Sequence, residues 1–354
     1  ALYQITTKGG LRASASRAYI TPVKHRLNLT LELRAHVQKL CFEGRRVTGV
    51  SYRQKGQLKT ANARGEVILC GGAINSPQLL QLSGIGPGAL LQALDIPVLH
   101  DMGQVGRNLK DHLGADLHYR SKVPTLNQAL RPTLGKLKVG LQYLFNRSGP
   151  LSLSLNQAGG FIRLRKDAIS PDIQIYFSPV SYTRAPVGTR HLMTPDHFAG
   201  FLLGFNPCKP TSMGHLEIAS PDAADAPLLY ANYMSTQHDT DLMRDGMRLM
   251  RNIAASPALA SVIETEISPG AKLTSDGDLD GFIRNNAWSV FHQCGTCRMG
   301  RDPASSVVDP TLKVHGIDGL RVADASIFPD IPTGNTNAVA IMVGEKAADL
   351  ICSK

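Results

Sequence analysis

One stretch near residue 70 combines a short apolar strand, a glycine turn and the start of a helix. Val67–Cys70 has the length and composition of a buried strand, and two glycines follow it directly. Asn75 then supplies a capping residue and Pro77 suits the first helical turn, before a helix expected over Gln78–Leu82. The first N–H groups of a helix can bind an anion. This order of elements predicts the edge of a phosphate or cofactor site.

A second stretch carries His292 and two cysteines. Cys294 and Cys297 have the spacing of a metal-binding or redox pair. A zinc site usually needs a second ligand pair, and the sequence contains no other Cys-x-x-Cys and no His-x-x-x-His. We therefore expect no metal and interpret the cysteines as packing residues. A lone histidine is more often structural than catalytic, so the role of His292 depends on its surroundings.

Those surroundings resemble the signatures of the glucose–methanol–choline oxidoreductases. The run Gly72–Gly86 is similar to the family's second signature, and Phe291–Gly300 resembles its catalytic histidine segment. Thr333–Ala338 resembles the run that closes the pattern. The resemblance extends from about residue 3 to residue 351 and is weakest over 121–285. It implies an FAD-dependent enzyme that oxidises an alcohol to an aldehyde or ketone by hydride transfer to the flavin.

The resemblance also implies two catalytic residues. His292 takes the position of the base that removes the hydroxyl proton, a role that suits a neutral imidazole at neutral pH. Asn335 matches the second site residue, which is His or Asn in the family. Its amide would hold the substrate oxygen towards the base.

Three cofactor positions near the end of the chain follow from the same resemblance. Asp324 and Ala325 resemble the stretch that meets the ribityl and phosphate region of FAD. Asn337 matches the position whose backbone approaches the pyrimidine edge. Asp324 also has a purely structural interpretation, as the cap of a helix or turn.

Three further cofactor positions lie early in the chain. Val37 resembles the residue whose backbone faces the adenine, and Gly72 and Ala73 would lie near the cofactor through the glycine turn. Alternatively, Val37 is a core residue and Gly72 only forms the turn.

The elements that must position these residues predict a domain built from both ends of the chain. We expect an α/β (α+β) fold in which residues 1–112 and 286–354 form the FAD-binding domain. Residues 113–285 would form a substrate-binding domain, with a mostly antiparallel sheet and helices on one side. Strands are expected at Leu27–Leu33, Val37–Phe42, Val47–Tyr52, Ile173–Phe177, Ala199–Phe205, His215–Ala219 and Leu320–Ala323, and helices at Leu137–Phe145, Asp239–Ala254 and Val339–Ile351.

Composition excludes several other classes of protein. The chain has 354 residues, 43% hydrophobic and 19% charged, as in ordinary globular proteins. The net charge is +10, but the basic clusters are short and lack interleaved aromatics, so we expect no nucleic-acid partner. No apolar run reaches the roughly 18 residues of a transmembrane helix. Six dispersed cysteines favour a reducing compartment. We expect a cytoplasmic protein, with peripheral contact to the inner membrane left open.

One family feature is missing from the sequence. The family normally begins with a strand, a Gly-x-Gly-x-x-Gly turn and a helix that seat the pyrophosphate. No such triplet of glycines occurs in this chain, and the opening residues from Ala1 resemble the middle of a protein. We expect the chain to lack the N-terminal nucleotide-binding segment and, by itself, to bind FAD weakly or not at all.

The substrate is expected to be a small alcohol, and the electron acceptor stays open. The chain looks most like the choline-dehydrogenase-like branch, in which choline users tend to carry a glutamate two residues after an Asp-His pair. Here Asp111-His112 is followed by Leu113 and Gly114, so an uncharged alcohol is at least as strongly expected. Two other hypotheses stay open: a catalytically silent, ligand-binding fragment or homologue, and a lyase that uses FAD structurally.

Overall fold

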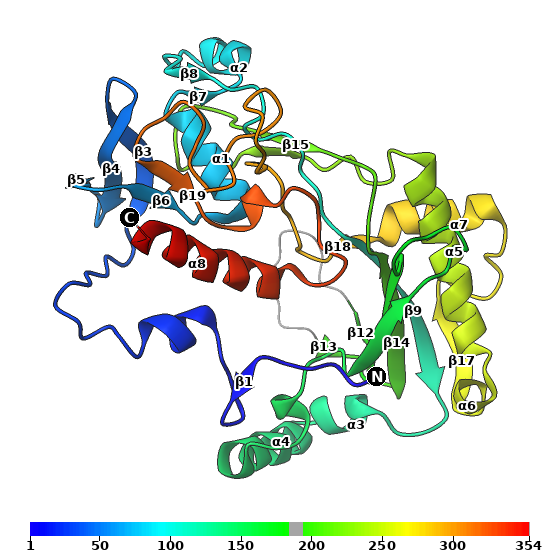
Figure 1. The fold of residues 1–354 in the computed structure, drawn as a ribbon. Coiled ribbons are helices and arrows are strands. Elements are labelled where there is room, and N and C mark those ends of the chain that lie inside the picture. Colours follow the sequence, from blue (N-terminus) through cyan, green and yellow to red (C-terminus); the bar gives the residue numbers. More distant parts are fainter. Residues whose placement is uncertain (184–193, 354) are drawn as a thin grey trace. The chain divides into compact units, whose positions relative to one another are not determined.

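The computed structural model describes residues 1–183 and 194–353, which form two compact units (Figure 1). Unit 1 consists of Ala1–Arg26, Leu113–Cys208 and Gln237–Ser289. Unit 2 consists of Leu27–His112, Lys209–Thr236 and Val290–Lys354. Within the described residues, no helix is both long and apolar enough to span a bilayer.

Unit 1 is built on an antiparallel sheet with the strand order β10-β11-β14-β9-β17, and β18 also pairs with β9. Helix α5 packs on β14 and β9, and Figure 1 shows it along the sheet. The close approach requires Gly246, because a Cβ there would lie 2.2 Å from the ring of Phe205. The strands of the unit are β1 (Thr7–Lys8), β2 (Leu11–Arg12), β9 (Leu113–Ser121), β10 (Ala158–Ile162), β11 (Ile173–Ser178), β12 (Tyr182–Thr183), β13 (Thr194–Pro195), β14 (Gly200–Pro207), β17 (Ile263–Ser268) and β18 (Trp288–Ser289). Its helices are η1 (Ser16–Ile20), α3 (Leu126–Leu130), α4 (Thr133–Asn146), η2 (Pro150–Ser152), α5 (Gln237–Ala254), α6 (Pro257–Ala260) and α7 (Asp276–Asn286).

Unit 2 combines a three-stranded antiparallel sheet, β3-β4-β5, with a parallel pair, β6 and β19. Helix α1 follows β6 directly, and its residue Leu80 is buried in the apolar core of the unit. The strands are β3 (His36–Glu43), β4 (Arg46–Gln54), β5 (Gln57–Asn62), β6 (Val67–Leu69), β7 (Ile85–Gly86), β8 (His100–Asp101), β15 (His215–Glu217), β16 (Leu228–Tyr230) and β19 (Leu320–Val322). The helices are α1 (Gly72–Leu82), α2 (Gly88–Ala93), η3 (Ala325–Ile327) and α8 (Thr336–Cys352).

The predicted fold class is confirmed: α/β, with a mostly antiparallel sheet in one unit. The chain passes between the two units at 112/113 and at 289/290, where the sequence analysis placed domain boundaries at 112/113 and 285/286. Two segments group differently from the expected domains. Residues 1–26 belong to unit 1, because Tyr3 bonds through its backbone to Gln157 and through its hydroxyl to the carbonyl of Ile175. Residues 209–236 belong to unit 2, because Gly214 and Leu109 exchange backbone hydrogen bonds.

Most predicted elements appear within a few residues of their expected ends. Residues 27–33, expected as a strand, contain no strand in the structure. Helix α1 begins at Gly72 and not after Asn75, so Pro77 lies within it and not in its first turn. The earlier start has a physical cause, because Asp324, distant in sequence, accepts the Gly72 N–H. The expected capping role of Asn75 is therefore wrong.

Candidate active site

The side chain of His292 is buried in unit 2 between an amide and a second imidazole. Its Nε2 lies 3.1 Å from Nδ2 of Asn335, the N-cap residue of α8. Its Nδ1 lies 2.9 Å from Nδ1 of His112, and the two rings meet edge to face. The structure thus brings together the two predicted catalytic residues, His292 and Asn335. It adds His112, which was considered in the sequence only for substrate choice.

The backbone of His292 is held by the buried carboxylate of Asp111. This carboxylate accepts the N–H of His292 at 2.8 Å, Nε2 of Gln293 at 3.0 Å and the hydroxyl of Tyr233 at 2.5 Å. Phe291 has a φ of 61°, a conformation that non-glycine residues rarely adopt and that surrounding structure must stabilise. Asp111 therefore fixes the turn that presents the imidazole. Neither Asp111 nor Tyr233 was predicted as a site residue.

The neighbours of His292 determine which ring nitrogen carries the proton. An amide nitrogen only donates, so with Nδ2 of Asn335 facing Nε2 that ring nitrogen is the acceptor. The ring proton then lies on Nδ1 and is donated to Nδ1 of His112. Burial lowers the pKa of His292 and outweighs the opposing charge of Asp111. The side chain is thus prepared as a neutral base with its lone pair at Nε2.

We expect His292 to titrate below the ordinary histidine pKa of 6.5. Because the folded pKa is lowered, the associated stability is complete above pH 6.5 and is lost as the pH falls through the folded pKa. The measurement is an NMR titration of ring-labelled histidines in the folded chain and in urea, with His292→Gln to assign the signal. A folded midpoint at or above the unfolded midpoint would contradict the assignment.

The predicted cofactor residues of the glycine turn and of the chain's end meet at the carboxyl ends of β6 and β19. The carboxylate of Asp324 accepts the N–H of Gly72 at 2.9 Å, the hydroxyl of Ser76 at 2.5 Å and the N–H of Ser326 at 2.7 Å. Gly72 has a φ of +79°, and a Cβ there would meet nothing within 4 Å. Asp324 therefore joins the first turn of α1 to the short 3-10 turn η3, and the edge is open beside Gly72.

The histidine segment is joined to this edge by hydrogen bonds from its backbone and from one hydroxyl. The hydroxyl of Thr296 donates to the carbonyl of Ala73 at 2.6 Å. The N–H of Gly295 donates to the carbonyl of Ala325 at 3.2 Å, and Cys297 pairs similarly with Ser326 at 2.8 Å. Asp324, Gly72, Ala73, Ala325 and the His292 segment consequently form one connected part of unit 2. Asn337 lies in the exposed first turn of α8, two residues after Asn335.

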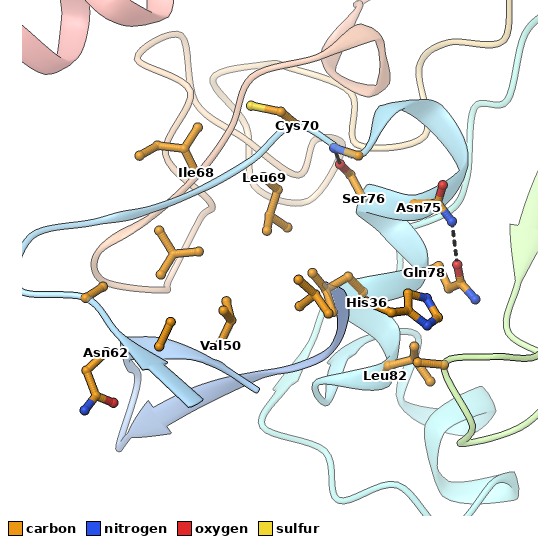
Figure 2. Close-up of a pocket in the computed structure, with 17 residues that line it drawn as sticks. His36, Val50, Asn62, Ile68, Leu69, Cys70, Asn75, Ser76, Gln78 and Leu82 are labelled. Carbon is orange, nitrogen blue, oxygen red and sulfur yellow. Dashed lines mark hydrogen bonds between the residues drawn. The ribbon is translucent and has the colours of Figure 1, made fainter. Parts of the chain in front are cut away.

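An open cavity of about 590 Å³ lies beside the glycine turn (Figure 2). Its lining comes from β3, β4, β5, β6 and α1 and includes Val37, Gly71 and Asn75. Figure 2 shows Ser76 reaching back to the N–H of Gly71 and Asn75 bonded to Gln78 at the rim. Val37 is only partly buried and lines this cavity, which is compatible with its expected place near an adenine.

The two cysteines beside His292 are buried in the apolar core of unit 2, as expected for packing residues. Burial raises the pKa of Cys294 to about 12 and raises that of Cys297 as well. Both thiols therefore stay protonated at neutral pH, and only a thiolate is an effective nucleophile or metal ligand.

Comparison with known proteins decides the family. The family pattern described as GMC oxidoreductase matches residues 1–114 through its N-terminal part and residues 210–344 through its C-terminal part. Together the two matches cover more than half of the chain. The chain belongs to the GMC oxidoreductase family. The resemblance seen in its motifs is thereby confirmed.

Curated relatives of this GMC chain include two bacterial proteins named oxygen-dependent choline dehydrogenase. The protein from Pectobacterium carotovorum subsp. carotovorum is 43% identical over 347 residues, which are 98% of this chain and 60% of the relative. The protein from Chromohalobacter salexigens is 42% identical over 353 residues, or 98% of this chain and 61% of the relative. The chain spans about three fifths of the length of the curated relatives it matches.

Solved structures of flavoenzymes share the fold. A formate oxidase from Aspergillus oryzae, solved in work on its FAD modification, superposes with a TM-score of 0.87 at 30% identity, over 94% of this chain and 62% of that one. Pyridoxine 4-oxidase from Mesorbium loti gives a TM-score of 0.81 at 29% identity, over 97% and 62%.

Proposed function

We propose that the protein containing this chain is an FAD-dependent alcohol oxidoreductase with His292 as its base. The observation that carries the proposal is the environment of His292, a buried imidazole whose Nε2 faces an amide and whose Nδ1 is held by His112. The relatives named choline dehydrogenase and the FAD-related formate oxidase support the same chemistry.

Unit 2 fits a flavin nucleotide by its own geometry. The edge at Gly72 leaves space where a Cβ would stand, and it opens α1, a helix of 11 residues whose positive N-terminal end favours an anionic group. The N-terminus of α8, a helix of 17 residues, lies next to His292 through Asn335 and would favour negative charge there. Val37, Gly72, Ala73, Asp324, Ala325 and Asn337 remain the proposed cofactor residues.

Each residue of the site has a definite task in this proposal. Bound FAD supplies the hydride acceptor. His292 receives the hydroxyl proton at Nε2, while Asn335 holds the substrate oxygen. His112 accepts a hydrogen bond from Nδ1 of His292 and so stabilises the imidazolium that forms. Asp111 keeps the backbone of His292 in place. Burial keeps the imidazole neutral before it reacts.

The test is product formation by the protein as its gene encodes it, loaded with FAD. An aldehyde or ketone should accumulate when an alcohol and an artificial electron acceptor are supplied together. If no alcohol is converted with any electron acceptor, the result would favour the hypothesis of a catalytically silent, ligand-binding protein. We also propose that the present chain alone binds FAD weakly, since its sequence contains no Gly-x-Gly-x-x-Gly.

Substrate choice is expected to depend on the charge at residue 114. Gly114 follows Asp111-His112 where choline users tend to carry a glutamate, so we propose an uncharged alcohol as a substrate at least as good as choline. Gly114→Glu should raise kcat/KM for choline relative to a neutral primary alcohol, because a carboxylate attracts a quaternary ammonium. Gly114→Gln has nearly the same volume without charge and should not change the ratio. Equal ratios in the two variants would contradict the argument.

A further inference from the structure

Helix α4 in unit 1 carries a continuous row of exposed apolar side chains. Leu134, Leu137, Leu141, Leu144 and Phe145 are 80%, 58%, 44%, 58% and 77% exposed, respectively. They recur at helical spacing and therefore share one side of α4, here called the α4 face. Val139, on the opposite side of the helix, is buried. The helix thus packs through one side and presents a second apolar side to solvent, which marks an interaction surface.

The same part of the chain is strongly cationic. Residues 117–166 contain no Asp or Glu and nine basic residues: Arg120, Lys122, Arg131, Lys136, Lys138, Arg147, Arg163, Arg165 and Lys166. Four of them lie in α4 or within two residues of its ends, and all four are exposed. The β1–β2 hairpin, which adds Lys8 and Arg12, is attached to α4 because the hydroxyl of Tyr143 donates to the carbonyl of Gly10 at 2.8 Å. The basic residues are therefore concentrated around α4, and the sequence analysis, which described only short basic clusters, did not identify this concentration.

We propose that the α4 face docks on the surface of an anionic lipid bilayer. Leucines and a phenylalanine on one side of a helix can enter the boundary between headgroups and acyl chains, while neighbouring lysines and arginines contact anionic headgroups. A nucleic acid could bind the basic residues, but it has no apolar region in which the row of leucines could be buried. An anionic bilayer supplies acyl chains for the leucines and charged headgroups for the lysines and arginines. This surface contact is independent of the proposed redox function.

Co-sedimentation of the chain with vesicles tests the proposal. The chain should bind vesicles made from an equal mixture of phosphatidylglycerol and phosphatidylcholine, and it should bind vesicles of phosphatidylcholine alone only weakly. Its affinity for the anionic vesicles should fall as the salt concentration rises. Replacing both Lys136 and Lys138 by Gln should weaken binding roughly thirtyfold at low salt, at the usual contribution of about 1 kcal/mol per cation. The triple change Leu134→Ser, Leu137→Ser and Leu141→Ser should weaken it about tenfold or more.

Matched controls distinguish docking through the α4 face from non-specific adsorption of apolar residues and from misfolding. The triple change Leu58→Ser, Ile169→Ser and Leu228→Ser alters exposed apolar residues outside the α4 face, and it should keep full binding. Lys55→Gln with Lys59→Gln serves as the charge control. Circular dichroism should show that every variant keeps the fold, and the two triple variants should differ from the unaltered chain by similar small shifts in melting temperature, because the altered side chains are largely exposed.

Three results would overturn the proposal. The first is an unaltered chain that does not bind anionic vesicles. The second is a control triple that loses as much affinity as the α4 triple. The third is light scattering that shows self-association, abolished by the α4 triple, with no vesicle binding, since the face would then serve a second copy of the chain.

Discussion

Replacing His292 by Gln is expected to slow alcohol-dependent flavin reduction by about 10²- to 10⁴-fold, the usual contribution of a general base. Glutamine retains polarity and approximate size but cannot accept a proton at neutral pH. The buried imidazole has its lone pair fixed at Nε2 by Asn335 and its Nδ1 held by His112. The measurement is anaerobic stopped-flow absorbance of the FAD-loaded protein as its gene encodes it.

A matched change at an exposed histidine provides the control for this result. His25→Gln should leave the rate of flavin reduction unchanged, because His25 is exposed and lies outside the site. The rate in His292→Gln should also rise with pH, since hydroxide can replace a missing base but not a missing structural contact. A loss of less than tenfold would remove His292 from the role of base.

The second large effect is expected for stability at Asp324. Asp324→Ala should lower the free energy of unfolding by about 3–5 kcal/mol, the usual cost when buried partners of a charged group are left unpaired. Its carboxylate accepts three hydrogen bonds, from Gly72, Ser76 and Ser326, and so joins the turn after β6 to the turn after β19. Urea unfolding of the purified chain measures the difference.

Two comparisons make the Asp324 result specific. Asp324→Asn keeps the shape and one acceptor oxygen, so its loss should be smaller than that of the alanine variant. Asp222→Ala removes an exposed carboxylate that accepts a single local N–H, from Ala224, and should cost about 1 kcal/mol or less. If Asp324→Ala costs no more than Asp222→Ala, the carboxylate does not hold the two turns together.

Local features of the site could be predicted from the sequence, because the signals lie within a few residues. The strand, glycine turn and helix after Val67 were recognisable from adjacent residue types. The resemblance of the segment around His292 selected the residue that the structure places against Asn335. The amphipathic pattern of α5 indicated its position over a sheet.

Features that depend on distant partners could not be predicted in the same way. Asp111 and His112 meet His292 across about 180 residues, and Asp324 meets Gly72 across 252. No local pattern marks such pairs. The start of α1 was misplaced for this reason, because the partner of its first N–H lies near the other end of the chain. The grouping of residues 1–26 with unit 1 likewise depends on Tyr3 meeting Gln157 and Ile175.

The most direct test of the redox proposal is the visible absorbance of the FAD-loaded protein, as its gene encodes it, during anaerobic addition of alcohols. We predict that the flavin absorbance bleaches with at least one small alcohol, choline or a neutral primary alcohol, and that His292→Gln bleaches far more slowly. A flavin-loaded protein that keeps its absorbance with every alcohol would contradict the account. It would instead favour a structural flavin, as in a lyase, or ligand binding without redox chemistry.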